Sequence, residues 1–222
     1  MPELLSQAEE NYLKAIYKVS RRDGTPVSNN AISVEMQTSA ASVTDMINRL
    51  SQKGLLNYQK RRGVSLTEEG YATATHLVRK HRLWETFLVD KLQFSWDEVH
   101  ELAEQLEHIQ SRELVNRLDE YLGFPRYDPH GDPIPDAEGL MAERQQVALS
   151  QLPVGQLAVV VGVKDHTTPF LQYLERTGLL LGVQLRVSER LDYDNSLQLV
   201  LDQGTTLLVS QKVGQNLFVQ LK

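Results

Sequence analysis

The chain has 222 residues, of which 41% are hydrophobic and 23% charged, and it contains no cysteine. This length allows one large domain or two to three small ones. The lack of cysteine excludes disulfides, thiolate zinc sites and iron-sulfur clusters, so any metal must be held by His, carboxylate, amide or water ligands. The sequence shows no apolar run of the roughly 18 residues needed for a membrane span and no signal-peptide pattern, so we expect a cytoplasmic protein without a membrane partner.

The charge is distributed unevenly along the chain, although the formal net charge is only −6. Residues 1–72 carry nine Lys/Arg against eight Asp/Glu, a net of +1. Residues 73–143 carry seven against fifteen, a net of −8, and residues 144–222 carry seven against six, a net of +1. Repulsion among the central carboxylates would be relieved by a bound cation, which leaves the N-terminal third for another partner.

The N-terminal third has the pattern of a helix-turn-helix. Apolar residues recur near the helical period over residues 7–20, and the sequence RRDGTP ends that helix at residues 21–26. A second short helix is predicted over NNAISVEM after Ser28. A third follows over AASVTDMINRLSQKG, with Ser39 as its N-cap and Gly54 as its stop. Helix, short turn and helix in this order are typical of DNA-binding domains.

A short hairpin is predicted directly after the third helix. The strand-like runs LLNYQ and VSLT flank the basic tip KRRG, which would form a wing beside the helices. Small and hydroxylated residues at the start of the third helix would let it approach base edges, while the basic tip would contact phosphates. The candidate DNA-binding residues are Ser39, Ala41, Ser42, Thr44, Asn29, Lys60, Arg61 and Arg62. The alternative interpretation is a helical bundle with a solvated basic loop.

The central segment is predicted to be helical. Helices are expected over residues 68–92, over residues 96–109 with a capping box from Ser95 to Glu98, and over residues 111–122 with a stop at Gly123. Their abundant Leu, Trp and Phe predict a dimer seam. Residues 124–139 contain four prolines and are interpreted as a domain linker.

Three histidines and three glutamates fall at helical spacings in this acidic segment. They are His81, Glu85, His100, Glu104, Glu107 and His108. Side chains three or four positions apart share one face of a helix, so two helical segments could direct them at one point. Imidazole nitrogen combined with carboxylate oxygen suits a divalent transition ion better than calcium, which predicts a metal-sensing centre. A solvent-facing amphipathic helix is the alternative, but it leaves the histidine spacing unexplained; His76, outside the pattern, is interpreted as structural.

The last third changes to short β-rich runs separated by Gly, Asp and Asn. Strands are predicted in QLAVVVGV, VQLRVSER, LQLVLD, TTLLVS and NLFVQLK, which implies a small barrel. One helix is expected between the first two, over residues 169–182, capped by Thr168 before Pro169.

Several motifs together resemble the diphtheria-toxin-repressor family of metal-dependent transcriptional repressors in its three-domain form. They are SVTDMINRLSQKGL with RGVSLTEEG, RKHRLWETFL, EVHELAEQLEHIQS and DPHGDPIP. The resemblance implies a multidomain α+β fold: a winged helix-turn-helix over residues 1–72, an all-α metal and dimerisation domain over 73–143 with its linker at 124–139, and an SH3-like, FeoA-like barrel over 144–222.

The same resemblance implies which residues hold metal. The primary site would consist of His81, Glu104, Glu107, His108 and Asn11. The ancillary site would draw on Glu85, His100, Asp128, His130, Asp165 and His166. Iron-responsive members have cysteine at the position of Glu104 and methionine at that of Asn11. Manganese-responsive members have glutamate at the first and usually aspartate at the second, so Glu104 favours manganese while the neutral Asn11 departs from both patterns.

We therefore expect a manganese-responsive repressor of metal-uptake genes that binds a pseudo-palindromic operator as a homodimer. The metal would fix the dimer in a geometry that fits DNA, with Fe²⁺ as the alternative ion and Zn²⁺ or Co²⁺ as substitutes in vitro. One rival is a metal-dependent hydrolase, but no separate nucleophile or phosphate loop accompanies the winged fold, so we expect neither enzyme activity nor a small-molecule substrate. The other is a winged-helix regulator that senses a small organic ligand in the barrel.

Overall fold

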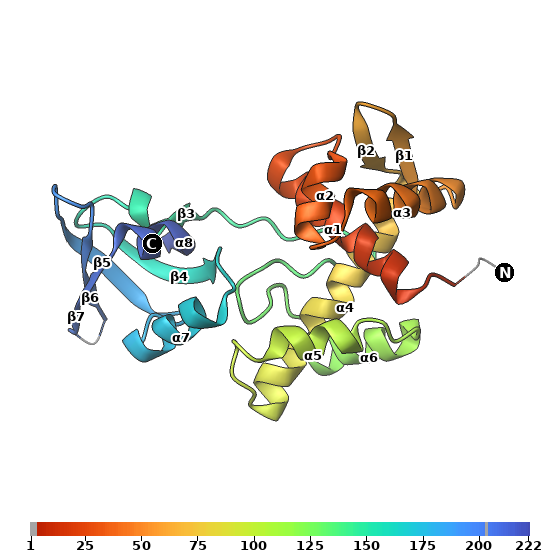
Figure 1. The fold of residues 1–222 in the computed structure, drawn as a ribbon. Coiled ribbons are helices and arrows are strands. Elements are labelled where there is room, and N and C mark those ends of the chain that lie inside the picture. The colour runs from red at the N-terminus through yellow and green to blue at the C-terminus, as the bar shows by residue number, and fades with distance from the viewer. Residues whose placement is uncertain (1–3, 203) are drawn as a thin grey trace. The chain divides into compact units, whose positions relative to one another are not determined.

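The computed structural model describes residues 4–202 and 204–222, which form two compact units (Figure 1). Unit 1 contains the described residues up to 81 together with 104–115 and 135–141, and unit 2 contains 82–103, 116–134 and 142–222. The division into the three residue ranges given above stays a prediction.

Unit 1 begins with the helices α1 (Gln7–Asp23), α2 (Asn29–Glu35) and α3 (Ala40–Gln52). Each starts at a serine that accepts a hydrogen bond from a backbone N–H of the first turn, as N-caps do. The predicted end of the first helix near residue 20 was too early. Its last turn continues to Asp23, and Gly24, with φ of 91°, ends it.

The predicted wing is confirmed. Strands β1 (Leu56–Gln59) and β2 (Gly63–Leu66) pair antiparallel, with Leu56 opposite Leu66 and Gln59 opposite Gly63. Gly63 has φ of 111°, and a Cβ there would collide with the carbonyl of Val27, which bridges to the wing. Only glycine combines that backbone conformation with so close an approach.

The core of unit 1 determines which face of α3 remains outside. Val43, Ile47 and Leu50 of this helix are fully buried, as are Leu13 and Ile16 of α1. These apolar residues repeat at three to four positions, so their burial turns the intervening polar residues outward. The small residues at the start of α3 are therefore left accessible.

Three further helices follow: α4 (Glu68–Leu92), α5 (Val99–Leu106) and α6 (Arg112–Tyr121). The bounds of α4 agree with the prediction. The helix predicted over 96–109 was too long at both ends, since α5 begins at Val99 and ends at Leu106. At its start, the Ser95 hydroxyl donates to Asp97 Oδ1 at 2.7 Å. Glu107 and His108 consequently lie in the turn after α5 rather than on its face.

Unit 2 contains a six-stranded antiparallel sheet with the order β3-β8-β4-β5-β6-β7. Its elements are β3 (Val147–Ala148), the 3-10 turn η1 (Leu149–Gln151), β4 (Leu157–Val163), α7 (Thr168–Thr177), β5 (Gln184–Arg190), β6 (Leu197–Leu201), β7 (Thr206–Val209), α8 (Gln211–Asn216) and β8 (Leu217–Leu221). The five longer strands were predicted. Three corrections apply to the helices: the N-cap of α7 is Thr167 rather than Thr168, α7 ends at Thr177 before Gly178 rather than at residue 182, and α8 was not foreseen.

The part of the linker around His130 and Gly131 packs onto the sheet of unit 2, and the linker forms no helix in the described structure. The amide of Val163 donates to the His130 carbonyl at 3.0 Å, and a Cβ on Gly131 would collide with the carbonyl of Val161. The Arg144 guanidinium lies 3.4 Å above the Tyr127 ring and donates to the Gly131 carbonyl at 3.1 Å. These contacts hold residues 127–131 against β4 and Arg144.

Among the described residues, no helix is both long and apolar enough to cross a membrane.

Candidate metal centres and nucleic-acid interface

The first cluster of polar side chains lies in unit 1, where α1, α4 and the end of α5 meet. We call it the primary cluster; it consists of Glu10, Asn11, Lys14, His81, Glu104, Glu107 and His108. Five of the seven were predicted from the sequence. The structure brings His81, Glu104, Glu107 and His108 into one network, although they come from different elements.

Glu107 is the centre of this network and is completely buried. Its Oε2 atom lies 2.7 Å from His81 Nδ1, and its two oxygens accept from Lys14 Nζ at 2.7 and 2.8 Å. Burial alone would raise the pKa of Glu107, but the hydrogen bond from His81 and the charge of Lys14 outweigh it and lower that pKa. Glu107 is therefore a charged carboxylate, ready to bind a cation.

His108 is held in a fixed orientation by two residues that the sequence analysis missed. Its Nδ1 atom lies 2.5 Å from Glu10 Oε2, while Gln110 Nε2 donates to the other Glu10 oxygen at 2.6 Å. An Nδ1–H that donates to Glu10 leaves Nε2 as the free acceptor, and Nε2 lies 4.0 Å from Glu107 Oε1. A carboxylate behind an imidazole is the usual support of a metal-ligating histidine.

Asn11 supplies an amide oxygen without a hydrogen-bond partner among the described residues. Its Oδ1 atom is buried, although buried acceptors nearly always have a donor or a cation. Together with imidazole nitrogens and carboxylates, this oxygen forms a mixed N/O donor set that fits Mn²⁺ or Fe²⁺. The residues present therefore suit the divalent ion that the sequence predicts.

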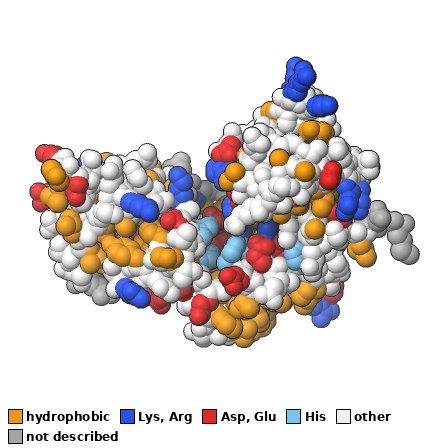
Figure 2. Space-filling view, viewed as in Figure 1, with side chains coloured by type: hydrophobic (Ala, Val, Ile, Leu, Met, Phe, Trp, Pro, Cys, Tyr) orange, Lys and Arg blue, Asp and Glu red, His pale blue; other side chains and the backbone are white. Residues whose placement is uncertain are grey.

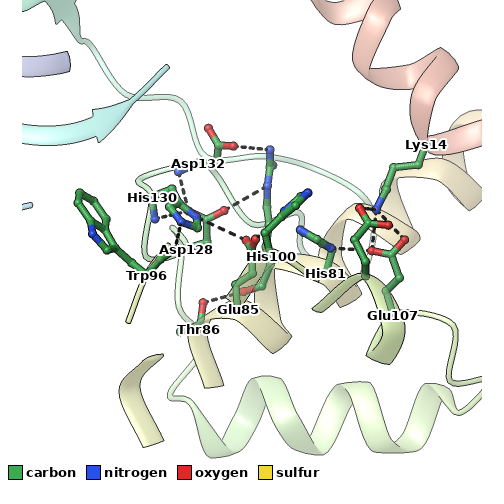
Figure 3. A network of polar contacts seen from close by, with 12 residues as sticks. Lys14, His81, Glu85, Thr86, Trp96, His100, Glu107, Asp128, His130 and Asp132 are labelled. Carbon is green, nitrogen blue, oxygen red and sulfur yellow. Dashed lines mark hydrogen bonds and ion pairs between the residues drawn. The ribbon is translucent and has the colours of Figure 1, made fainter. Parts of the chain in front are cut away.

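A second cluster, which we call the linker cluster, lies in unit 2 (Figure 3). Glu85, Asp128 and His130 are all buried, and their ligand atoms lie within 4.8 Å of one another. His100 Nδ1 is 3.2 Å from Glu85 Oε1, and His130 Nδ1 is 3.7 Å from Glu85 Oε2. The structure thus gathers four of the six predicted ancillary residues, with His100, Asp128 and His130 around the carboxylate of Glu85.

The protonation of the linker cluster follows from its burial. His130 Nε2 lies 2.7 Å from the Trp96 carbonyl and donates to it, which leaves Nδ1 facing Glu85. Burial alone would lower the pKa of His130, but hydrogen bonding and attraction to Glu85 raise it to about 9. Burial raises the pKa of Asp128 to about 7, assisted by the charges of Asp132 and Glu85. Both shifts favour the protonated forms, so a cation bound here would have to displace the protons of His130 and Asp128.

The other two predicted ancillary residues have different surroundings. Asp165 Oδ1 accepts the backbone N–H of Thr167 at 2.9 Å and so stabilises the entry to α7. The ring of His166 lies 5.1 Å from that of His130, centroid to centroid, at the margin of the linker cluster. His76, interpreted as structural, is half-buried; burial first, and then the charges of Lys80 and Arg79, lower its pKa to about 4.

The candidate DNA-binding residues lie on two neighbouring elements of unit 1. Ser39, Ala41 and Ser42 are exposed at the start of α3, where the two serine hydroxyls lie 2.9 Å apart. Asn29 Nδ2 donates to Thr44 Oγ1 at 3.2 Å and so links α2 to α3. Residues 60–62 are exposed at the tip of the hairpin, where Figure 2 shows gathered Lys and Arg side chains.

An exposed helix-turn-helix with a basic wing, in a chain that also carries buried His and carboxylate clusters, defines a DNA-binding regulator with candidate divalent-metal centres. Family models match nearly the whole chain. They describe the iron dependent repressor N-terminal DNA binding domain at residues 4–64, the iron dependent repressor metal binding and dimerisation domain at 67–136, and the FeoA domain at 147–221.

Individual relatives agree with these matches. The iron-dependent repressor IdeR of Mycobacterium leprae is 34% identical over 195 residues, which cover 82% of this chain and 84% of that protein. The diphtheria toxin repressor of Corynebacterium jeikeium is 33% identical over 137 residues, which cover 62% of this chain and 57% of the relative. The chain belongs to the iron-dependent, or diphtheria toxin, repressor family: it is a metal-dependent transcriptional repressor and not an enzyme.

Solved structures of the same kind are similar over their full length. A manganese-dependent transcriptional repressor in complex with manganese has a TM-score of 0.87 at 34% identity, with 96% of this chain and 100% of that chain covered. The manganese regulator SloR has a TM-score of 0.73 at 34% identity, with 96% and 98% covered. The predicted fold class, with a winged helix-turn-helix, a helical domain and an SH3-like domain, is confirmed.

Proposed function

We propose that this repressor responds to manganese and controls genes for metal-ion uptake. The observation that carries the proposal is the donor set of the primary cluster, in which carboxylates at Glu104 and Glu107 accompany imidazoles and an amide oxygen. Hard oxygen donors without sulfur favour Mn²⁺. The similarity to a repressor solved with manganese supports the same ion.

The primary cluster is proposed to couple metal to DNA binding through α1. Asn11 lies on α1, which packs against the helix-turn-helix, whereas Glu104 lies in the last turn of α5 and Glu107 in the turn that follows it. A bound divalent ion would take ligands from both elements at once, in place of the ion pairs that Lys14 of α1 makes with these two carboxylates. Asn11, His81, Glu104, Glu107 and His108 would hold it, and the resulting shift toward one arrangement of α1 is a population shift by differential affinity.

A homodimer is the proposed DNA-binding form. Tyr121 and Phe124 are 65% and 64% exposed, and the ring centroid of Tyr121 lies 6.3 Å from that of Phe87. Exposed aromatic residues of this kind suit a self-complementary seam. Two wings in such a dimer would read the two half-sites of a pseudo-palindromic operator, spaced by multiples of about 34 Å.

The linker cluster is the proposed ancillary site. Glu85, Asp128 and His130 would supply the ligands, with His100 and His166 at its edge. Asp165 would join only if it released the Thr167 amide.

Operator binding with and without metal tests the proposal. Glu104→Ala and His108→Ala should each abolish manganese-stimulated binding in a gel-shift titration while leaving the dimer folded. Glu98→Ala, which removes an exposed carboxylate just before α5, is the matched control and should behave as the native protein. Retained manganese-dependent binding in both site variants would contradict the assignment.

Iron is the second candidate because relatives at 34% identity are named iron-dependent repressors. Titration of operator binding with Mn²⁺, Fe²⁺, Zn²⁺ and Co²⁺ separates the two. If Fe²⁺ activates operator binding at a lower free concentration than Mn²⁺ does, iron is the regulatory ion. Operator binding indifferent to every metal would revive a regulator that senses an organic ligand.

A further inference from the structure

Lys14 reaches into the primary cluster from the middle of α1. Its Nζ atom lies 2.5 Å from Glu104 Oε1 and 2.7 and 2.8 Å from the two oxygens of Glu107 (Figure 3). The Lys14 side chain is only 18% exposed, and Glu107 is completely buried. An ammonium has three N–H donors, and this one directs them at two carboxylates. It is thus a cation built into the chain at the centre of the cluster.

The oxygens that Lys14 contacts are those that a divalent ion would need. Both oxygens of Glu107 accept from Lys14, and Oε2 also faces His81. An ammonium and a divalent cation on the same carboxylates would repel each other, most strongly at Glu107, which is completely buried and not screened by water. The two cations therefore exclude each other at these atoms.

We propose that Lys14 is an internal competitor of the regulatory metal. It balances part of the negative charge of Glu104 and Glu107 in the metal-free protein, and it must leave them before an ion can bind. Because displacing Lys14 costs free energy, its presence weakens the apparent metal affinity. It thereby raises the free metal concentration at which the repressor becomes active. This inference rests on the proposed role of Glu104 and Glu107 as ligands. It adds that Lys14 sets the free metal concentration at which their site is filled.

Lys18 provides a matched control on the same helix. It lies one turn after Lys14, its side chain is 69% exposed, and it pairs with Glu35 at 2.8 Å. Lys18→Met therefore removes the same charge and the same functional group without touching the cluster. Lys14→Arg is the second variant, because it keeps a cation opposite the carboxylates.

Direct Mn²⁺ titration of the full-length, chelator-treated protein by calorimetry measures the effect without DNA. Lys14→Met should bind Mn²⁺ at least about tenfold more tightly than the native protein, a difference of about 1.4 kcal/mol. Lys18→Met and Lys14→Arg should stay within about threefold of the native affinity. Without metal, Lys14→Met should also unfold at a lower temperature than the native protein. Mn²⁺ should raise its unfolding temperature by more, because the metal then replaces the lost countercharge.

An unchanged or weaker Mn²⁺ affinity in Lys14→Met would overturn the inference and leave the proposed metal response intact. So would a gain of equal size in Lys18→Met, which would show a general charge effect. If the native protein itself failed to bind Mn²⁺, Fe²⁺, Zn²⁺ and Co²⁺, the proposed function would fail and the inference with it.

Discussion

Replacement of Glu107 by alanine is the perturbation whose consequences the structure defines best. In the metal-free protein this change removes the carboxylate that accepts from His81 Nδ1 and two of the three close contacts of Lys14. Breaking a buried ion pair by removing one partner typically destabilises by about 3–5 kcal/mol. Lys14 keeps Glu104 and is 18% exposed, so we take the lower end, about 3 kcal/mol.

Thermal unfolding followed by far-UV circular dichroism tests this magnitude. For a protein of this size, about 3 kcal/mol corresponds to a decrease in Tm of about 6–12 °C. Glu107→Gln keeps the side-chain volume and one acceptor oxygen, so its Tm should decrease clearly less than that of Glu107→Ala. Added Mn²⁺ should stabilise the native protein but neither variant. A decrease in Tm below about 2 °C for Glu107→Ala would refute the reasoning, since it would mean that the buried charges do not depend on this carboxylate.

Three further predictions concern other parts of the molecule. Glu10→Gln should weaken Mn²⁺ binding by about 10–100-fold in calorimetric titration, because His108 loses the carboxylate that orients it; unchanged affinity would contradict this role. Replacing Arg61 and Arg62 by alanine should weaken binding to every DNA sequence and flatten the salt dependence by a slope of about 2; an unchanged slope would remove the wing from the interface. Because the pKa of His130 is raised to about 9, its protonated imidazole stabilises the metal-free fold fully below pH 6.5, and this contribution disappears as the pH rises through about 9. Urea unfolding across this range should show the loss of stability, and His130→Gln should abolish this pH dependence.

The sequence predicts helices well where one periodic apolar face decides their length. The bounds of α4 followed from its pattern, and the N-caps Ser28 and Ser39 marked α2 and α3. The start of α5 was mistaken because Ser95 and the following acids looked like a capping box, whereas the hydroxyl bonds to a local carboxylate. The six-residue α8 has no periodic signal of its own and owes its helix to packing on β3, η1 and β8.

The candidate site was predictable in its histidines and glutamates but not in its supporting residues. Glu10 and His108 are 98 positions apart, and Lys14 and Glu104 are 90 apart, so no local spacing reveals either pair. Glu10 belongs to a capped first turn and reads as an ordinary helix-start acid. Tertiary folding converts these common residues into partners of the predicted ligands.

The close approach of Gly131 to β4 has a consequence for how the protein could be shortened. The backbone around Asp128 and His130 is shaped by the strand it lies on, through the Val163 amide and the carbonyl of Val161. A chain trimmed after residue 143 would retain every residue of the linker cluster yet lose the template that shapes it. The primary cluster, assembled wholly in the other unit, would survive such a truncation, so sensitivity to metal could outlast the C-terminal sheet.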